Sequence, residues 1–561
     1  MAQLPKSSSA NLDAALVAFR AGDLPGARRR VMDLLKLKPQ DIAARFLLAR
    51  LWLEGGDLPS GRRELEVLLK QAPGHGPAHV MMGQVLVHQG EKPRARQYFE
   101  RAIALNDQIP EAWAQAAILD EEFAGLPKAL DRLQRASQAL PSHFGILTNL
   151  GIALGKSGDK VAARKVFERA LQIEERSELT HFNLGRLLRE AGEVDAALRH
   201  YRRAIELKAD FADAYHNLGY LLLDLHQVAE ATEAFRAATR LRFAPAAQLA
   251  PGNRSAVLFR RTTAAKMRHD IEQFRYLREQ GVLAGKIDQI IADHESVLTV
   301  LPAPTGGDMA VDLPPTALTL LAPSYNRLLH WDAGAALSDP AVNPALDWAA
   351  IERGYHQQAP GIAWFDGLLT EEAMTALRRF CMNSTIWSEF RYHQGYVGSV
   401  IESGFCCPLL FQIADELAAA MPTVFDGHPV TKMWAFKYDH RLSGIPIHAD
   451  FAAVNVNFWI TPDNANLNPE DGGLKVWNKE APLDWDFATY NNDEPAIRQF
   501  LRDSDAQMIN VPHRQNRTVM FNSDLFHETG SLNFREGYEN RRINVTMLFG
   551  RRHASASPAR Q

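Results

Sequence analysis

Two histidines and one aspartate in the C-terminal part of the chain have the residue types and the spacing of a metal site. His448 and Asp450 are separated by one residue, so on extended backbone both side chains point to the same side. His527 follows a strand-like run at 517–522, so only the folding of a sheet can return it to the other two. Two imidazoles and one carboxylate can occupy one face of an octahedron and leave the other positions open on Fe(II). The three residues therefore predict a reactive iron site.

Other interpretations of these side chains stay open. His448 and His527 can be core histidines whose ring nitrogens bind only protein atoms, and the same three ligands can bind zinc. His513 is the alternative to His527, although it precedes the strand-like run instead of following it. A zinc site would give no reason for the presence of Arg542 on the strand that follows His527.

The strand expected at 541–549 carries two adjacent arginines that face opposite ways. Arg542 shares a polar face with Asn544 and Thr546, whereas Arg541 shares an apolar face with Ile543. We expect the polar face to line the inside of a barrel, where a planar guanidinium matches a carboxylate through two parallel, charge-assisted hydrogen bonds. The strand at 454–460 alternates in the same way, and we expect its polar face to line the barrel with Asn455, Asn457 and Trp459.

The first 245 residues repeat with a period of 34 residues. One small residue recurs in each of seven units, and a second small series follows at the same interval, as two tightly crossing helices require where they touch. The register holds from residue 8 to residue 245 without an insertion, which predicts a stack of helix hairpins. The first series consists of Ala15, Ala49, Gly83, Ala117, Gly151, Gly185 and Gly219.

This pattern resembles the tetratricopeptide repeat, whose helix hairpins stack into an all-α superhelix. Asn149, Asn183 and Asn217 recur at the repeat interval, and in the similar repeats of O-linked N-acetylglucosamine transferases such asparagines clamp a peptide backbone. An amide side chain can donate and accept together, so it can bind backbone groups of any sequence. The alternative is that Asn-Leu-Gly is simply common in this repeat. Leu47 and Met81 interrupt the series upstream, so a groove of this kind is confined to the last units.

The chain after the repeats divides into four further parts. Residues 246–300 combine charged and apolar residues at helical spacing, and we expect them to cap the solenoid. Prolines and glycines predict an interdomain linker at 301–345. We expect a second domain at 350–552 and a short tail at 553–561.

The domain at 350–552 resembles the 2-oxoglutarate-dependent prolyl hydroxylases and their relatives. The resemblance is carried by the opening GIAWFDGLLTEEAMTALRRF, by His448 and Asp450, by the DGG run at 471–473, and by His527 with Arg542 on the following strand. It implies a double-stranded β-helix, or jelly-roll barrel, with flanking helices. It also implies that His448, Asp450 and His527 bind Fe(II), with 2-oxoglutarate and O2 as cosubstrates.

The same resemblance assigns the cosubstrate site. Arg542 stands where the family binds the distal carboxylate of 2-oxoglutarate, Tyr438 matches a tyrosine that often reaches that carboxylate, and Thr546 is a further candidate. Related halogenases replace the carboxylate ligand, so the presence of Asp450 favours hydroxylation. The stretch 482–508 is extra relative to the shortest relatives, and it is either a lid over the metal or a surface insertion.

Composition excludes several other classes of function. The 561 residues carry a formal net charge of -4, so no overall basic field attracts nucleic acid. We find no secretory signal and no apolar run that would span a membrane. Three cysteines, two of them adjacent, do not indicate a disulfide framework, and a cytoplasmic location is therefore expected.

Together these features predict a multidomain protein in which a tetratricopeptide superhelix precedes a jelly-roll oxygenase that hydroxylates a protein or peptide captured by the repeats. Two alternatives remain. The barrel can oxidise a small molecule while the repeats serve assembly, or the protein can be a repeat scaffold with a vestigial barrel. The complete ligand set and Arg542 argue against a vestigial barrel.

Overall fold

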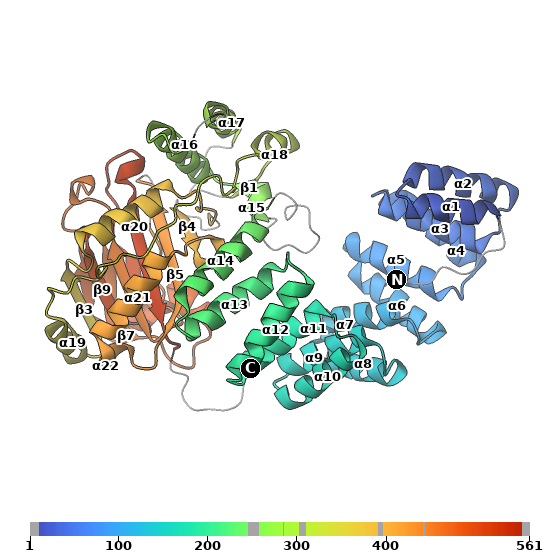
Figure 1. The fold of residues 1–561 in the computed structure, drawn as a ribbon, viewed down its shortest axis with the longest axis horizontal. Helices are drawn as coiled ribbons and strands as arrows, with labels where there is room; N and C mark the ends of the chain where they lie inside the picture. The colour runs from blue at the N-terminus through green and yellow to red at the C-terminus, as the bar shows by residue number, and fades with distance from the viewer. Residues whose placement is uncertain are drawn as a thin grey trace. The chain divides into compact units, whose positions relative to one another are not determined.

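The computed structural model describes residues 10–244, 257–283, 285, 287–301, 310–390, 396–440 and 444–552 (Figure 1). The chain forms two compact units, Met1–Ala209 and Asp210–Gln561, each of which is described by itself. The predicted tail at 553–561, residues 246–256 of the predicted capping segment and residues 302–309 of the predicted linker lie outside the described residues. Among the described residues, no helix combines the length and the apolar character needed to cross a membrane.

The first unit consists of helices that pack in consecutive pairs. Aspartate side chains accept hydrogen bonds from the first turn of several helices, as Asp41 does from the Ala44 N–H at 2.9 Å and Asp159 from the Ala162 N–H at 2.9 Å. The helices are α1 (Ala10–Arg20), α2 (Leu24–Leu37), α3 (Ile42–Glu54), α4 (Leu58–Gln71), α5 (Gly76–His88), α6 (Lys92–Leu105), α7 (Pro110–Ala124), α8 (Leu126–Ala139), α9 (Phe144–Lys156), α10 (Lys160–Ile173), α11 (Glu178–Glu190) and α12 (Val194–Leu207).

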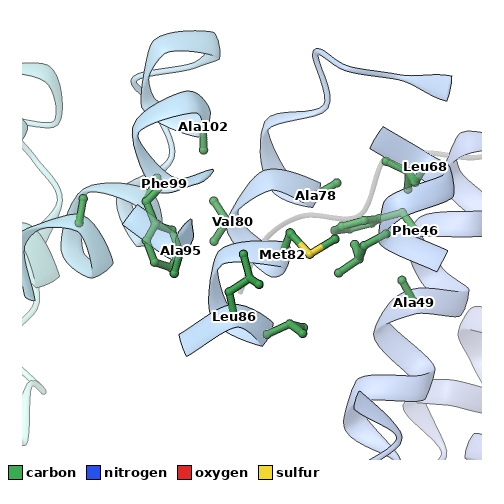
Figure 2. Packing of buried hydrophobic residues seen from close by; sticks show 14 of the residues in the cluster. Phe46, Ala49, Leu68, Ala78, Val80, Met82, Leu86, Ala95, Phe99 and Ala102 are labelled. Atoms are coloured by element: carbon green, nitrogen blue, oxygen red, sulfur yellow. The ribbon is translucent and has the colours of Figure 1, made fainter. Parts of the chain in front are cut away.

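The small residues of the 34-residue period lie where the two helices of a hairpin touch. A Cβ added at Gly83 in α5 would lie 2.6 Å from the ring of Phe99 in α6, and one added at Gly151 in α9 would lie 2.6 Å from Phe167 in α10. Both rings are buried. Figure 2 shows the apolar core around Phe99, to which Met82 of α5 also contributes. In these hairpins the 34-residue period therefore corresponds to a contact between a small residue of the first helix and an aromatic ring of the second.

The last hairpin, α13 (Ala212–Asp224) and α14 (Val228–Arg242), belongs to the second compact unit. Its internal packing follows the repeat, because a Cβ at Gly219 would lie 2.8 Å from Phe235. The ring of Phe235 also stacks on Phe411 of α21 (Pro408–Ala420), with 6.2 Å between ring centres. Helix α14 contacts η3 (Ile401–Ser403) as well. The final repeat thus packs directly on the C-terminal domain.

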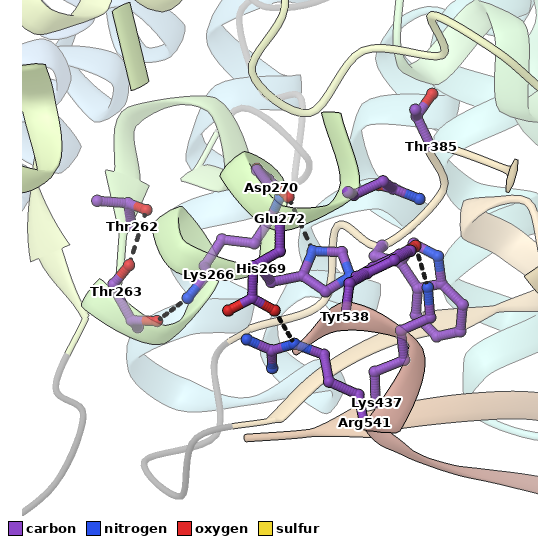
Figure 3. Close-up of polar contacts among 12 residues, drawn as sticks. Thr262, Thr263, Lys266, His269, Asp270, Glu272, Thr385, Lys437, Tyr538 and Arg541 are labelled. Carbon is purple, nitrogen blue, oxygen red and sulfur yellow. Dashed lines mark hydrogen bonds and ion pairs between the residues drawn. The ribbon is translucent and has the colours of Figure 1, made fainter. Parts of the chain in front are cut away.

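Helix α16 (Ala264–Glu279) is held against the strands by buried polar contacts (Figure 3). Arg541 donates to Glu272 of this helix at 2.7 Å. The buried Lys437 of β5 donates to the hydroxyl of Tyr538, whose ring centre lies 5.7 Å from that of His269 in α16. Burial lowers the pKa of Lys437 well below its ordinary value. The other helices of this unit are α15 (Val257–Arg260), α17 (Ile287–Val300), α18 (Pro315–Leu321), α19 (Trp348–Gln357), α20 (Glu371–Asn383), α22 (Pro422–Phe425), α23 (Phe487–Asn492) and α24 (Glu494–Asp503), with η4 (Asp463–Ala465) and η5 (Tyr538–Asn540) as further short turns.

The C-terminal domain is built on two antiparallel sheets. The larger sheet has the strand order β3-β9-β6-β11-β5-β4, and the smaller has the order β10-β7-β8. A separate short pair joins β1 (Arg261–Thr262) to β2 (Val311–Asp312). The strands of the two sheets are β3 (Ile362–Asp366), β4 (Tyr396–Val400), β5 (Val430–Tyr438), β6 (Val454–Trp459), β7 (Leu474–Glu480), β8 (Met508–Val511), β9 (Arg517–Asn522), β10 (Leu525–Thr529) and β11 (Arg542–Phe549).

The two sheets pack face to face. Trp459 and Phe521 of the larger sheet share one buried core with Val476, Val511 and Leu525 of the smaller sheet. Helices α20 and α21 lie over the opposite face of the larger sheet (Figure 1). The side chains that β6 and β11 direct toward the smaller sheet are therefore enclosed between the two sheets. The candidate site lies among them.

Candidate metal centre

A backbone bridge between distant segments brings the three predicted ligands together. His448 lies in the loop after β5 and His527 lies in β10, and their backbones exchange two hydrogen bonds, of 3.0 Å from His448 N–H and 2.8 Å from His527 N–H. The two imidazole centres are 4.3 Å apart. One ligand atom each from His448, Asp450 and His527 lies within 4.8 Å of the others, and within the described part of the chain this is the group of such side chains that could hold a metal ion.

Backbone carbonyls orient both imidazoles toward the aspartate. Nδ1 of His448 lies 2.8 Å from the carbonyl of Pro446, and Nδ1 of His527 lies 3.0 Å from the carbonyl of Leu525. A proton on Nδ1 satisfies each carbonyl and leaves Nε2 as the free lone pair. The Nε2 atoms lie 3.9 Å and 3.6 Å from the Asp450 carboxylate oxygens, so three ligand atoms converge.

The electrostatics of this cluster favour a bound cation. Burial raises the pKa of Asp450, although His448 and a 2.6 Å hydrogen bond from Asn455 act in the opposite direction. Burial also lowers the pKa of His527 well below its ordinary value, and the neighbouring His448 adds to this effect. A neutral imidazole is a metal ligand, and a divalent cation would stabilise the ionised carboxylate. The donor set therefore fits Fe(II).

The structure does not bring His513 to this cluster. Its ring lies 5.9 Å from that of Trp459 and 5.1 Å from that of Phe534, measured between ring centres. Burial lowers the pKa of His513 to about 3, with the charge of Arg542 as the second cause. Of the two histidines considered as distal ligand, His527 is the one beside Asp450.

A cavity of about 370 Å³ opens onto the three ligands. Its polar floor is a hydrogen-bonded network in which Asn457 Oδ1 accepts from Asn544 at 2.8 Å and from Thr546 at 2.7 Å, while Asn457 Nδ2 donates to Asn455 Oδ1 at 2.5 Å. Asn455 in turn donates to Asp450. The barrel-lining residues expected on β6 and β11 thus connect the cavity floor to the metal ligand.

Arg542 is buried behind this cavity with two of its nitrogens engaged. Its Nε donates to the carbonyl of Gly472 at 2.6 Å, and Nη2 donates to the carbonyl of Gly473 at 3.0 Å. Its guanidinium carbon lies 4.7 Å from the ring centre of Tyr438, which lines the cavity. Nη1 is buried and has no hydrogen-bond partner among the described residues. The guanidinium is therefore held in place with Nη1 available to a ligand.

Helix α23, within the stretch 482–508, forms part of the cavity wall. Phe487, Asn491 and Asn492 of α23 line the cavity. Asn491 Nδ2 donates to the carbonyl of Ala449 at 2.9 Å, and Ala449 N–H donates to the carbonyl of Tyr490 at 2.9 Å. Helix α23 is thus attached to the residue between His448 and Asp450.

Sequence reasoning missed a charged pair and several aromatic residues in the cavity. Lys432, Trp434 and Phe436 line it together with Tyr438, and the period-two alternation of β5 would have placed them on one face. Glu402, which pairs with Lys432, comes from η3 and carried no comparable signal.

The three repeat asparagines are distributed over both compact units. Asn149 in α9 and Asn183 in α11 lie in the first unit, whereas Asn217 in α13 lies in the second. The amide nitrogen of Asn183 donates to the carbonyl of Leu179 at 2.8 Å, and that of Asn217 donates to Asp213 at 2.9 Å. Each of these two nitrogens uses one N–H within its own helix, so a peptide clamp would rely on the second N–H and the amide oxygen.

Comparisons with known proteins concern the helical repeats. A family model described as "TPR repeat" matches residues 185–225. Two models described as "Tetratricopeptide repeat" match further ranges, one at 12–76 and the other at 76–109 and 212–245. The N-terminal region therefore carries tetratricopeptide repeats, which generally mediate binding of proteins or peptides. No curated protein matches the chain.

Several solved structures are similar to parts of the chain. YrrB, described as "a TPR protein with an unusual peptide-binding site", is 20% identical with a TM-score of 0.27, and the match covers 32% of this chain and 92% of that one. PilF of Pseudomonas aeruginosa is 15% identical with a TM-score of 0.33, and the match covers 36% and 91%. Cut9–Hcn1 of the APC/C is 16% identical with a TM-score of 0.37, and the match covers 42% and 47%. Such TM-scores do not define a shared fold.

Proposed function

We propose that this chain is an Fe(II)- and 2-oxoglutarate-dependent oxygenase that hydroxylates a protein or peptide bound by its repeats. The observation that carries the proposal is the convergence of two oriented imidazoles and a carboxylate, His448, Asp450 and His527, at a polar-floored cavity. Two antiparallel sheets that pack face to face support a jelly-roll barrel around it.

Each residue of the site has a defined task in this proposal. His448, Asp450 and His527 would hold Fe(II), which, with 2-oxoglutarate and O2, supplies the oxidising power for hydroxylation of a C–H bond. Asn455 fixes the orientation of the Asp450 carboxylate through its 2.6 Å hydrogen bond. Arg542 binds the far carboxylate of 2-oxoglutarate, because it is a buried cation with an unused donor beside the cavity residue Tyr438.

A polypeptide substrate is favoured by the position of the last repeat. His216 and Tyr220 of α13 both contact Glu402, at 3.4 Å and 3.1 Å, and Glu402 lines the cavity. A polypeptide bound along this hairpin would therefore lie next to the cavity wall. A small-molecule oxygenase would need no such junction between its repeats and its cavity.

Turnover of 2-oxoglutarate tests the proposal. The Fe(II)-loaded full chain should release succinate slowly by itself and faster with a peptide substrate. Asp450→Ala should abolish both rates and weaken Fe(II) binding in equilibrium dialysis, because the carboxylate is the only anionic ligand of the three. The control Asp484→Ala removes an exposed carboxylate of the same domain and should change neither quantity. Undiminished Fe(II)-dependent turnover by Asp450→Ala would refute the metal assignment.

A further inference from the structure

Two further buried side chains next to Arg542 lack hydrogen-bond partners. The indole Nε1 of Trp459, both ring nitrogens of His513 and Nη1 of Arg542 are buried and have no hydrogen-bond partner among the described residues. Trp459 is 0% exposed, His513 is 5% exposed and Arg542 is 1% exposed. Buried polar groups in folded proteins are almost always hydrogen-bonded, so orphaned groups of this kind require an explanation. Their proximity to one another points to a shared hydrogen-bond partner.

These three residues lie close together between the two sheets. The guanidinium carbon of Arg542 lies 5.6 Å from the ring centre of Trp459, whose ring centre lies 5.9 Å from that of His513. A single turn holds both flanking residues, because Gly472 and Gly473 accept from Arg542 and Asp471 accepts from the backbone N–H of His513 at 3.1 Å.

Close approach of this turn depends on a glycine. A Cβ added at Gly473 would lie 1.9 Å from the carbonyl oxygen of Val511 and 2.8 Å from the backbone nitrogen of His513. No side chain fits there without a shift of backbone. The DGG run therefore has a physical role, which is to let one turn pack closely against both Arg542 and His513.

The chemistry of the three groups specifies an anion. Burial lowers the pKa of Arg542, and Tyr438 and Asp471 offset this only in part, so its buried charge calls for a further negative partner. The indole N–H and the guanidinium can only donate hydrogen bonds, and a neutral imidazole contributes one further N–H. A ligand that meets these donors must offer several acceptor atoms and a negative charge, as a carboxylate does.

We infer that Trp459 and His513 join Arg542 in binding the far carboxylate of the cosubstrate, and that they select a dicarboxylic 2-oxoacid over a monocarboxylic one. The inference rests on the proposed function, which supplies the 2-oxoacid. Tyr438 connects these groups to the cavity, because it lines the cavity and lies against the Arg542 guanidinium. Trp459 and His513 thus act as specificity residues in addition to the arginine.

Direct binding measurements on the Mn(II)-loaded full chain test this inference without turnover. Trp459→Phe keeps an aromatic ring and removes the N–H donor, and His513→Phe removes both ring nitrogens. Each substitution should raise the Kd for 2-oxoglutarate by about 10- to 100-fold, as expected for one lost hydrogen bond to a charged group. The Kd for pyruvate, which lacks the far carboxylate, should stay unchanged. His513→Gln restores an N–H donor and should recover part of the affinity.

The controls separate this inference from the proposed function. Trp485→Phe removes an indole N–H elsewhere in the domain and should leave the Kd for 2-oxoglutarate unchanged. Mn(II) affinity and circular dichroism of each variant report whether the fold and the metal site persist. Wild-type affinity for 2-oxoglutarate in both Trp459→Phe and His513→Phe, together with weak binding by Arg542→Ala, would overturn the inference and leave the oxygenase proposal standing. An absence of 2-oxoglutarate binding by the wild-type chain would overturn both.

Discussion

Arg541 and Arg542 are neighbours in the sequence but have separate partners in the structure. Arg542 donates to the glycine carbonyls of the 471–473 turn between the sheets. Arg541 donates to Glu272 of α16 at 2.7 Å (Figure 3). It also lies 3.8 Å from the carboxylate of Asp439. Successive residues of a strand point to opposite faces, so one arginine serves the proposed ligand site and the other fastens a helix to the sheet.

Replacing Arg541 with alanine should therefore lower stability and spare cosubstrate binding. The substitution removes a buried cation from two carboxylates, and we expect a loss of about 1–3 kcal/mol in the free energy of unfolding, at the lower end because Glu272 is partly exposed. Urea unfolding followed by fluorescence measures this loss. The Kd for 2-oxoglutarate should change less than about twofold, whereas Arg542→Ala should raise it strongly. The opposite ranking of the two variants would mean that β11 is out of register by one residue.

At the scale of the element, two glycines of helix α9 have contrasting surroundings. A Cβ at Gly151 would lie 2.6 Å from the ring of Phe167 in the partner helix α10, whereas a Cβ at Gly155 would meet nothing within 4 Å. Alanine favours helix over glycine by about 0.8–1.0 kcal/mol at both positions. Insertion of extra volume into a packed interior typically costs about 1–3 kcal/mol. The balance between these effects decides the sign of each substitution.

Gly155→Ala should stabilise the α9–α10 hairpin, and Gly151→Ala should destabilise it. The first variant gains helix propensity alone, while the second also pushes against the buried Phe167. Amide hydrogen exchange of α9 and α10 in the full chain measures the effect locally, which suits repeats that do not unfold in one step. Gly151→Ala with Phe167→Leu should recover protection because the shorter side chain removes the overlap. Equal protection in the two single variants would contradict the packing that we assign to the repeat period.

The contrast between the repeats and the C-terminal domain shows what the sequence alone can predict. The hairpins follow from their period because Gly151 and Phe167 belong to one unit, and contacts within a hairpin are local. The metal ligands could also be selected, since His448 and Asp450 are separated by one residue and His527 follows the run at 517–522, although the structure places His448 in a loop and His527 within β10. The Trp459–His513 contact could not be predicted, because it joins β6 to a loop that no pattern relates to it.

The packing of the last repeat on the C-terminal domain could not be predicted from the sequence either. This seventh unit follows the same period as the other six, yet its Phe235 also stacks on Phe411 of α21. Contacts between residues so distant in the chain leave no periodic signal. For the same reason, the role of Glu402 in both the cavity and the hairpin junction appears only in the folded chain.

At the scale of the second unit, Glu402 connects the repeat hairpin to the cavity. One carboxylate oxygen lies 3.1 Å from the Tyr220 hydroxyl and 3.4 Å from Nε2 of His216, and the Lys432 ammonium contacts the same oxygen. Burial by itself raises the pKa of Glu402, but the neighbouring His216 side chain and the Lys432 charge outweigh it, so the pKa lies well below the ordinary value of 4.5. Attachment of the hairpin should therefore depend on pH.

The sign of this dependence follows from linkage. Because the pKa is lowered by folding, the ionised carboxylate stabilises the junction fully above about pH 4.5, and this contribution is lost as the pH falls toward the folded value. Amide hydrogen exchange of α13 and α14, corrected for intrinsic rates, should show protection that decreases by about tenfold for each pH unit below 4.5 in the wild type. Glu402→Gln should already show reduced protection at pH 7 and little further change on acidification. Identical pH profiles for the two proteins would mean that Glu402 does not secure the hairpin. A change in succinate release by Glu402→Gln at pH 7 would then reflect only the position of Glu402 in the cavity wall.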